Sequence, residues 1–219
     1  MSTVKYYDWS YHQARTRPNK VAVKEVSTGR ETTYGQLEER SCRLASWLQN
    51  KGVKKGDRVA ILIHNCTEVF ELEFACAKIG AIELPLNWRL TKPELEYILN
   101  DSSPEVLIYG SNFADTAKAL TKDCSIKNSL EIDDEDQNNE YEQALKENID
   151  FDVVETTHDD LIMLMYTSGT TGHPKGAMIT HEMQFYNIVN LAGSSRVTDK
   201  TVQLIAVSYT HLTLPTKSG

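Results

Sequence analysis

Residues 166–176, with the sequence YTSGTTGHPKG, hold the residue types whose spacing is most informative about chemistry. Residues 167–172 are all small, so they leave little side-chain bulk between the backbone amides and a bound anion. Glycine permits positive-φ turns, which let successive N–H groups converge on one point. The segment has three such residues, Gly169, Gly172 and Gly176. The pattern indicates a loop that binds a polyphosphate.

Polar side chains in the same segment support this interpretation. Hydroxyl groups donate hydrogen bonds to phosphate oxygens, and an ammonium group suits phosphate as a point charge. The candidates are Thr167, Ser168, Thr170, Thr171 and Lys175. The alternative is a solvated Ser/Thr/Gly linker. Such a linker rarely follows a fully apolar strand, whereas residues 161–166 read LIMLMY, so we favour phosphate binding.

Two common phosphate-binding motifs do not fit the spacing. A P-loop NTPase needs Gly, four residues, and then Gly-Lys-Ser/Thr before a helix. Here Gly169 and Gly172 are three positions apart, and Gly176 follows Lys175 where a hydroxyl residue is required. No Gly-x-Gly-x-x-Gly pattern occurs in the chain. Residues 176–180 are predicted to form a short strand, so the phosphates would meet a loop between two strands, without a helix dipole.

The loop resembles the signature loop of the adenylate-forming ligases, the family of AMP-forming acyl-CoA synthetases. The resemblance extends upstream through almost the whole chain. Residues 17–23 are similar to the N-terminal entry of the family, residues 33–37 to its first core motif, and residues 77–87 to its second. Residues 87–91, NWRLT, are most similar to fatty-acyl-CoA ligases within the family.

The resemblance implies an activity and its co-substrates. The parent enzyme would join a carboxylate, here a fatty acid, to ATP, release pyrophosphate, and pass the acyl group from the adenylate to coenzyme A. Mg²⁺ would bridge the ATP phosphates, with the hydroxyl of Thr167 as one candidate ligand. The residues implied to bind the ATP phosphates are Thr167, Ser168, Gly169, Thr170, Thr171, Gly172 and Lys175.

The resemblance also implies that the site is incomplete. The family uses a downstream glutamate for Mg²⁺, an aspartate for the ribose, an adenine pocket and a lysine from a C-terminal domain, and none of these can be located in the 219 residues. We therefore expect residues 1–206 to be a truncated AMP-binding domain that is inactive alone. The alternative is a stand-alone nucleotide-binding module without catalysis.

The last residues depart from the family pattern. Residues 201–206 are predicted to form a buried strand, after which the family has a proline, an aromatic residue and a histidine. Ser208 and Thr210 stand at the first two of these positions, although His211 fits the third. Residues 207–219 resemble translated sequencing-adapter read-through, and we expect them to be a non-native tail. A divergent edge strand is the alternative.

Charge and composition exclude several classes of protein. The net charge of −8 argues against nucleic-acid binding, which needs a clustered basic surface. Residues 123–160 hold 14 Asp/Glu and 2 Lys, a local charge of −12, which leaves +4 for the rest of the chain. We expect the acidic residues 131–140 to be a solvated connector rather than a metal site, because like charges repel.

The cysteines and the lengths of the apolar runs indicate the cellular compartment in which the protein is expected. Cys42, Cys66, Cys76 and Cys124 have no zinc-binding spacing, and free thiols are expected. The N-terminus has no apolar signal-peptide core, and the longest apolar run is far shorter than the ~20 residues that span a bilayer. The expectation is a cytoplasmic protein without a transmembrane segment; its oligomeric state does not follow from the sequence.

Helices and strands are predicted to alternate. Thr33 with Gln36, and Thr91 with Glu94, have the spacing of capping boxes at helix starts. Predicted helices cover residues 33–52, 69–79, 91–100, 113–120 and 139–148, and predicted strands cover residues 58–63, 81–84, 105–109 and 161–166. Such alternation with short apolar strands is typical of an α/β fold with a parallel-rich sheet flanked by helices. The resemblance to the adenylate-forming ligases implies that this is an incomplete N-terminal part of their catalytic domain.

The histidines and the remaining carboxylates do not form a second catalytic motif. His64 follows a predicted strand, and a backbone hydrogen bond is the favoured explanation over a ligand contact. His173 lies inside the phosphate loop and would at most tune it. His181 begins a helix and is expected to be structural, while Asp159 and Asp160 are expected to face solvent. No nucleophile motif supports a hydrolase.

Overall fold

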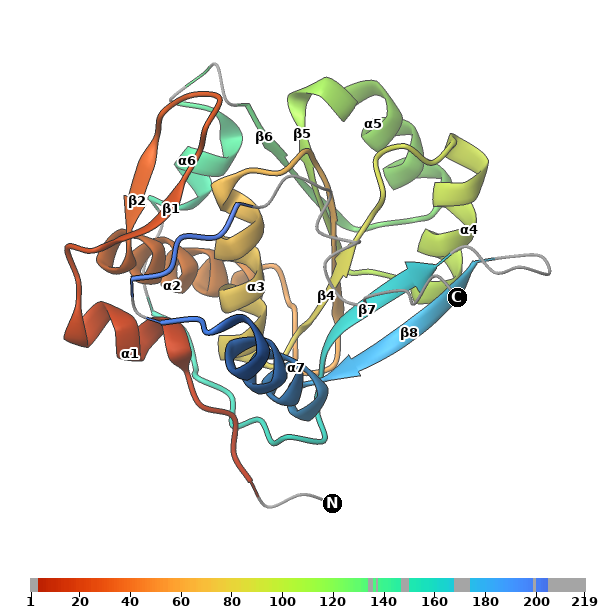
Figure 1. The fold of residues 1–219 in the computed structure, drawn as a ribbon. Coiled ribbons are helices and arrows are strands. Elements are labelled where there is room, and N and C mark those ends of the chain that lie inside the picture. Colours follow the sequence, from red (N-terminus) through yellow and green to blue (C-terminus); the bar gives the residue numbers. More distant parts are fainter. Residues whose placement is uncertain are drawn as a thin grey trace.

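The computed structural model describes residues 4–133, 136, 138–146, 150–167, 174–198 and 200–204. Within these ranges a six-stranded sheet has the order β6-β5-β3-β4-β7-β8, and a separate hairpin pairs β1 with β2 (Figure 1). The pairs β6–β5, β5–β3, β3–β4 and β4–β7 are parallel, and β7–β8 is antiparallel. The strands are β1 Val21–Lys24, β2 Glu31–Thr33, β3 Arg58–Leu62, β4 Ile82–Pro85, β5 Val106–Gly110, β6 Asn128–Ile132, β7 Leu161–Thr167 and β8 Lys175–Thr180.

Helices connect the parallel strands and cover both faces of the sheet (Figure 1). They are α1 Trp9–Thr16, α2 Tyr34–Asn50, α3 Thr67–Ile79, α4 Lys92–Ser102, the 3-10 helix η1 Ser111–Phe113, α5 Ala114–Asp123, α6 Glu140–Ala144 and α7 His181–Ser195. In the part of the chain that the structure describes, no helix has both the length and the apolar character needed to cross a bilayer. The predicted α/β fold with a parallel-rich sheet is confirmed.

The alternation of side chains along the strands divides the core in two. In β3, Val59 and Ile61 pack against α2 and α3 on one face of the sheet. Ala60 and Leu62 pack against α4 and α5 on the other face. Both sets are almost fully buried. A parallel strand covered on both faces needs an uninterrupted apolar sequence, which explains the run from 59 to 62.

The predicted helix boundaries rest on caps that the structure shows. The Thr33 N–H donates to Gln36 Oε1 at 2.9 Å, and the Gln36 N–H donates to Thr33 Oγ1 at 3.3 Å, so the capping box of α2 is confirmed. At the end of α3, Gly80 has φ 68°, a conformation that disfavours any residue with a side chain. The helix therefore ends at the predicted glycine.

The prediction of a solvated acidic connector over residues 131–140 is wrong at both of its ends. Residues 128–132 form β6, which pairs in parallel with β5, and Ile132 is buried in the core. Residue 140 begins α6, which is shorter than the predicted helix over 139–148, and the next residue, Tyr141, is also buried. Ile132 and Tyr141 thus attach the two described ends of this acidic segment to the hydrophobic core.

The predicted strand over residues 201–206 does not form where the structure describes it. Residues 201–204 are not in a strand, and Val202 and Leu204 are 94% and 72% exposed. A strand requires a paired neighbour, and residues 201–204 have none among the described strands. Residues 205 and 206 and the predicted tail 207–219 lie outside the described residues.

Candidate nucleotide-phosphate site

The β7–β8 hairpin carries the predicted phosphate loop. Six cross-strand pairs join the two strands, from Leu161 opposite Thr180 to Thr167 opposite Lys175. The strand predicted over residues 176–180 is thus confirmed, one residue longer, and α7 begins only at His181. The loop therefore joins two strands and does not open a helix. Ser168, Gly169, Thr170, Thr171 and Gly172, together with His173, lie outside the described residues.

The hairpin places both ends of the loop at the carboxyl edge of the sheet. Because β7 runs parallel to β4, Thr167 at its end lies at the same edge as the ends of β3, β4 and β5. Ligands of open α/β sheets bind beyond the carboxyl ends of the strands. Lys175 is exposed as the first residue of β8, directly opposite Thr167. These two described members of the predicted site are therefore brought together.

Packing, and not a positive φ, explains Gly176. We expected this glycine to form a turn, but it is not among the described positive-φ residues and lies within β8. A Cβ on Gly176 would lie 3.0 Å from Leu164 Cδ1 and 3.2 Å from Tyr166 Cζ. The Tyr166 hydroxyl donates a hydrogen bond to Asp101, which holds the ring in place. Gly176 thus leaves room for the Tyr166 ring beside the base of the loop.

Aromatic side chains gather at the same edge of the sheet. His64 follows β3, Trp88 follows β4, and Phe113 lies in η1 after β5. The His64 ring packs edge-on against Trp88 at 4.6 Å and Phe113 at 5.0 Å between centroids. Arg89 lies over the Trp88 ring at 4.6 Å. The His64 ring is exposed and contacts both aromatic rings, and the backbone hydrogen bond expected for it stays a prediction.

The other end of the hairpin is fixed by Asp160 and His181. Asp160 was expected to face solvent, but its carboxylate accepts hydrogen bonds from the Thr157 N–H at 2.7 Å and from Lys55 Nζ at 2.8 Å. These contacts hold the pKa of Asp160 below its usual value, against the opposing effect of burial. The His181 N–H donates to the Asp160 carbonyl at 3.0 Å. These bonds join the start of β7 to the start of α7.

His181 is buried and structural, as expected. It is 3% exposed, its ring packs on Tyr6 at 4.4 Å, and neither ring nitrogen has a hydrogen-bond partner among the described residues. Burial disfavours the charged imidazolium and lowers the pKa of His181 to about 4. The ring is therefore neutral at physiological pH and contributes packing at the foot of the hairpin.

No metal centre can be assembled from the described ranges. No cluster of three His, Cys, Asp or Glu side chains suitable for a metal ion occurs among them. Cys42, Cys66, Cys76 and Cys124 are free thiols, as expected, but only Cys76 is buried and the others are half-buried. The contribution of Thr167 to a Mg²⁺ site remains a prediction, because the loop that would present the phosphates is outside the described residues.

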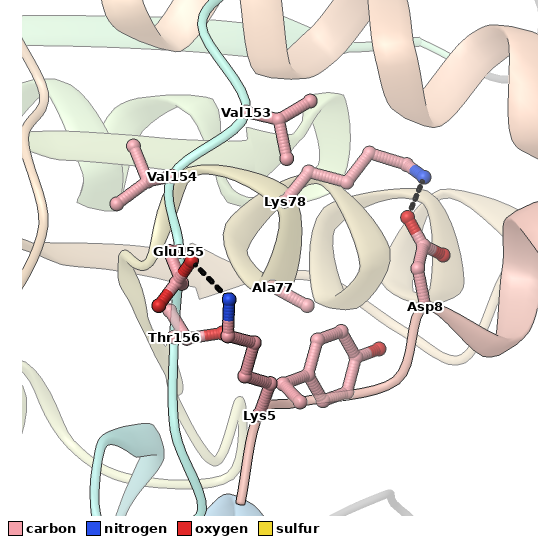
Figure 2. A pocket seen from close by; sticks show the side chains of 9 residues that line it. Lys5, Asp8, Ala77, Lys78, Val153, Val154, Glu155 and Thr156 are labelled. Carbon is pink, nitrogen blue, oxygen red and sulfur yellow. Dashed lines mark hydrogen bonds and ion pairs between the residues drawn. The ribbon is translucent and has the colours of Figure 1, made fainter. Parts of the chain in front are cut away.

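A cavity of about 300 Å³ lies away from the hairpin loop, between the N-terminal segment, the end of α3 and residues 153–156 (Figure 2). Its charged groups are already paired. Lys78 Nζ donates to Asp8 at 2.7 Å and to Glu38 at 2.8 Å, and Lys5 pairs with Glu155 at 2.7 Å. These ion pairs attach the N-terminal segment to α3 and to residues 153–156, so we assign the cavity a structural role.

Comparisons with known proteins agree with the fold. The model of the family described as "AMP-binding enzyme" matches residues 10–214. A feruloyl-CoA synthase from Amycolatopsis sp is 37% identical over 203 residues, which are 93% of this chain and 39% of the relative. A long-chain-fatty-acid–CoA ligase from Mycobacterium tuberculosis is 38% identical over 180 residues, 82% of this chain and 36% of the relative.

Solved structures give the same result. A long-chain-fatty-acid CoA ligase from Rhodopseudomonas palustris superposes with a TM-score of 0.82 at 30% identity and covers 92% of this chain and 51% of that one. The o-succinylbenzoate CoA synthetase of Bacillus subtilis, in complex with an acyl-adenylate, superposes with a TM-score of 0.79 at 27% identity, covering 95% and 51%. The chain thus spans well under half the length of these curated relatives and about half of these structures.

Proposed function

Because this chain belongs to the AMP-binding enzyme family, we propose that it is the N-terminal part of an ATP-dependent, AMP-forming acyl-CoA ligase. In the first half-reaction a carboxylate oxygen of the substrate attacks the α-phosphorus of ATP, and pyrophosphate leaves. In the second, the sulfur of coenzyme A attacks the acyl carbon of the adenylate, and AMP leaves as the thioester forms. The chain supplies phosphate contacts to the first half-reaction.

One observation carries this proposal: the β7–β8 hairpin holds Thr167 and Lys175 opposite each other at the carboxyl edge of a parallel sheet. The strand pair fixes the ends of a loop made of hydroxyl residues and glycines. Negative charge accumulates on the departing pyrophosphate in the transition state, and preorganised donors aimed at that charge lower the barrier. We assign this role to Lys175 and to the residues from Thr167 to Gly172, with Mg²⁺ as the bridging ion.

We propose a fatty acid as the carboxylate substrate. The sequence at 87–91 supports this choice, and several relatives are named for fatty acids. Other relatives are named for ferulate and for a steroid carboxylate. A hexadecanoate, a ferulate and a short-chain carboxylate therefore belong in the same assay.

The exposed apolar side chains of α7 support the view that this chain is one part of a larger catalytic unit. Five large apolar side chains of α7 are each about half exposed: Met183 (55%), Tyr186 (55%), Ile188 (54%), Val189 (47%) and Leu191 (45%). Large apolar surfaces on a folded chain mark contacts with further protein. Residues for adenine, ribose and the final acyl transfer would lie in that further part.

The experiment compares the 219-residue chain with the polypeptide encoded by the complete gene. With ATP, Mg²⁺ and a fatty acid, the complete polypeptide is expected to release pyrophosphate and to form acyl-CoA once coenzyme A is added. The 219-residue chain should release none above a heat-inactivated control. Pyrophosphate release by the short chain would contradict the incomplete-site interpretation, and ATP binding without turnover by the complete polypeptide would favour a non-catalytic nucleotide-binding module.

A further inference from the structure

Glu83 is an ionisable group that the proposed function does not use. It lies in the middle of β4, between Val59 of β3 and Met163 of β7. It has no exposed surface, and neither carboxyl oxygen has a hydrogen-bond partner among the described residues. Because Glu83 is level with Val59, which packs under α3, its side chain belongs to the same face of the sheet. A carboxyl group in such a place needs an explanation.

The surroundings of Glu83 favour the protonated acid. Burial, followed by the negative charge of Glu73 on α3, raises the pKa of Glu83 far above its usual value. Cys76, one helical turn after Glu73, is fully buried, and this burial, followed by the charges of Glu83 and Glu73, raises the pKa of its thiol. Met163 is the neighbour from β7. Among the described groups that act on Glu83, none is a cation.

Glu73 connects this buried acid to α7. Gln184 Nε2 donates a hydrogen bond to Glu73 Oε1 at 2.7 Å, which joins α7 to α3. Burial, followed by the charges of Asp8 and Glu73, raises the pKa of Tyr6, whose ring packs on His181 at the start of α7. The helix α7 follows β8 without an intervening loop, so its position and that of the hairpin are coupled (Figure 1).

We propose that the proton on Glu83 keeps α7 hydrogen-bonded to α3. With the proton in place, the carboxyl group is neutral and tolerates both burial and the neighbouring Glu73 carboxylate. Loss of the proton to hydroxide or buffer base leaves a buried negative charge on Glu83 next to the carboxylate of the half-buried Glu73. Separation of α7 from α3, with the Gln184–Glu73 hydrogen bond broken, admits water to the new charge. Because α7 follows β8 directly, the β7–β8 hairpin is then also held less tightly at alkaline pH.

Amide hydrogen exchange of the 219-residue chain over a pH series tests this inference, because it reports the opening of α7 without any assay of activity. If opening releases one proton, the opening constant rises tenfold per pH unit between the unfolded and folded pKa values of Glu83, after correction for intrinsic exchange. We expect this rise in the wild type and a flat profile for Glu83→Gln. Glu182→Gln, an exposed change on α7 itself, is the matched control and should follow the wild type.

The proposal would be refuted if the opening constant of wild-type α7 did not change with pH. It would also be refuted if the opening constant of Glu83→Gln rose with pH as steeply as that of the wild type. If Glu83→Gln does not fold, Glu73→Gln decides the question, because it removes the repelling charge and leaves β4 intact. The rise in the opening constant should then end at a lower pH than in the wild type. An identical profile for Glu73→Gln and wild type would refute the coupling. Neither readout depends on ligase activity, so failure here leaves the proposed function standing.

Discussion

Thr167 and Lys175 are cross-strand partners at the open end of the β7–β8 hairpin, and they mark the two ends of the predicted phosphate loop. The pairing sets the direction in which the chain leaves one strand and returns to the other. Lys175 gains a fixed position from this register, although its side chain is exposed. A lysine anchored on a strand can present its ammonium group to a phosphate held by the preceding loop.

The first prediction concerns Lys175 in the complete enzyme. Lys175→Ala removes one charge-assisted contact and should cost about 1.5–3 kcal/mol of transition-state stabilisation. If the contact strengthens as pyrophosphate leaves, kcat should fall and the KM for ATP should rise, while the KM for the fatty acid changes little. Steady-state kinetics of pyrophosphate release measures all three.

Lys127→Ala is the matched control for this change. Lys127 is an exposed lysine paired with Glu105 near the opposite edge of the sheet, next to β6. Its removal should leave the ATP kinetics unchanged. Equal effects of the two substitutions would assign Lys175 to general surface electrostatics and remove it from the site.

The second prediction concerns the space beside Tyr166. Gly176→Ala places a methyl group against Leu164 and Tyr166, and overpacking of this kind costs about 1–3 kcal/mol of unfolding free energy. Gly193→Ala, in α7, meets no atom within 4 Å and should stabilise the chain by about 0.5–1 kcal/mol. Urea unfolding of both variants measures whether the unfolding free energy falls for Gly176→Ala and rises for Gly193→Ala. A neutral Gly176→Ala would show that the Tyr166 ring moves without cost.

The third prediction concerns a buried ionic network between α2, α3 and α6. Arg40 donates to Glu71 at 2.6 Å and to Glu142 at 2.6 Å, and Tyr141 donates to Glu71 at 2.7 Å. Arg40→Ala would leave the buried Glu71 carboxylate without its cation. Breaking one partner of a buried pair costs about 3–5 kcal/mol.

Arg43 provides the comparison for Arg40 on the same helix. It pairs with Glu39, whose side chain is 59% exposed, and also donates to the Leu145 carbonyl. Arg43→Ala should therefore cost about 1 kcal/mol or less. Thermal or urea unfolding of the two variants measures both values. Similar losses would indicate that Arg40 contributes packing rather than charge compensation.

The fourth prediction is a loss of stability in acid that depends on His181. The folded-state pKa of about 4 lies below the unfolded value of 6.5, so the unfolded chain binds the proton more tightly. The contribution of this group is therefore complete above about pH 6.5 and is lost as the pH falls towards 4. The loss amounts to about 3 kcal/mol over the window.

Urea titrations at several pH values test the role of His181. His181→Gln should flatten the dependence of the unfolding free energy on pH between 6.5 and 4 relative to the wild type. His12→Gln, which alters a half-buried ring bonded to Tyr7, should preserve it. A wild-type slope in His181→Gln would assign the acid sensitivity to carboxylates such as Asp160 instead.

The sequence alone determined the elements whose signals are local. The capping residues Thr33 and Thr91 and the terminating Gly80 are read from a few neighbouring positions, and the structure confirms helices that begin and end there. The apolar run of β3 predicted a strand buried on both faces. The composition of residues 167–172 predicted phosphate binding through the chemistry of its side chains, and this requires no knowledge of packing.

Only the tertiary structure decided the features that depend on distant partners. The first residues of the acidic segment, 131 and 132, belong to β6, which pairs with the edge of β5, and the hydroxyl group of the buried Tyr141 donates to Glu71. The role of Gly176 depends on the Tyr166 ring across the hairpin. In the sequence, Glu83 is a single polar residue within an apolar strand. The charge that acts on it belongs to Glu73, which lies ten positions earlier on a helix. Such contacts arise from the strand order and from the faces that the helices cover, which local sequence does not encode.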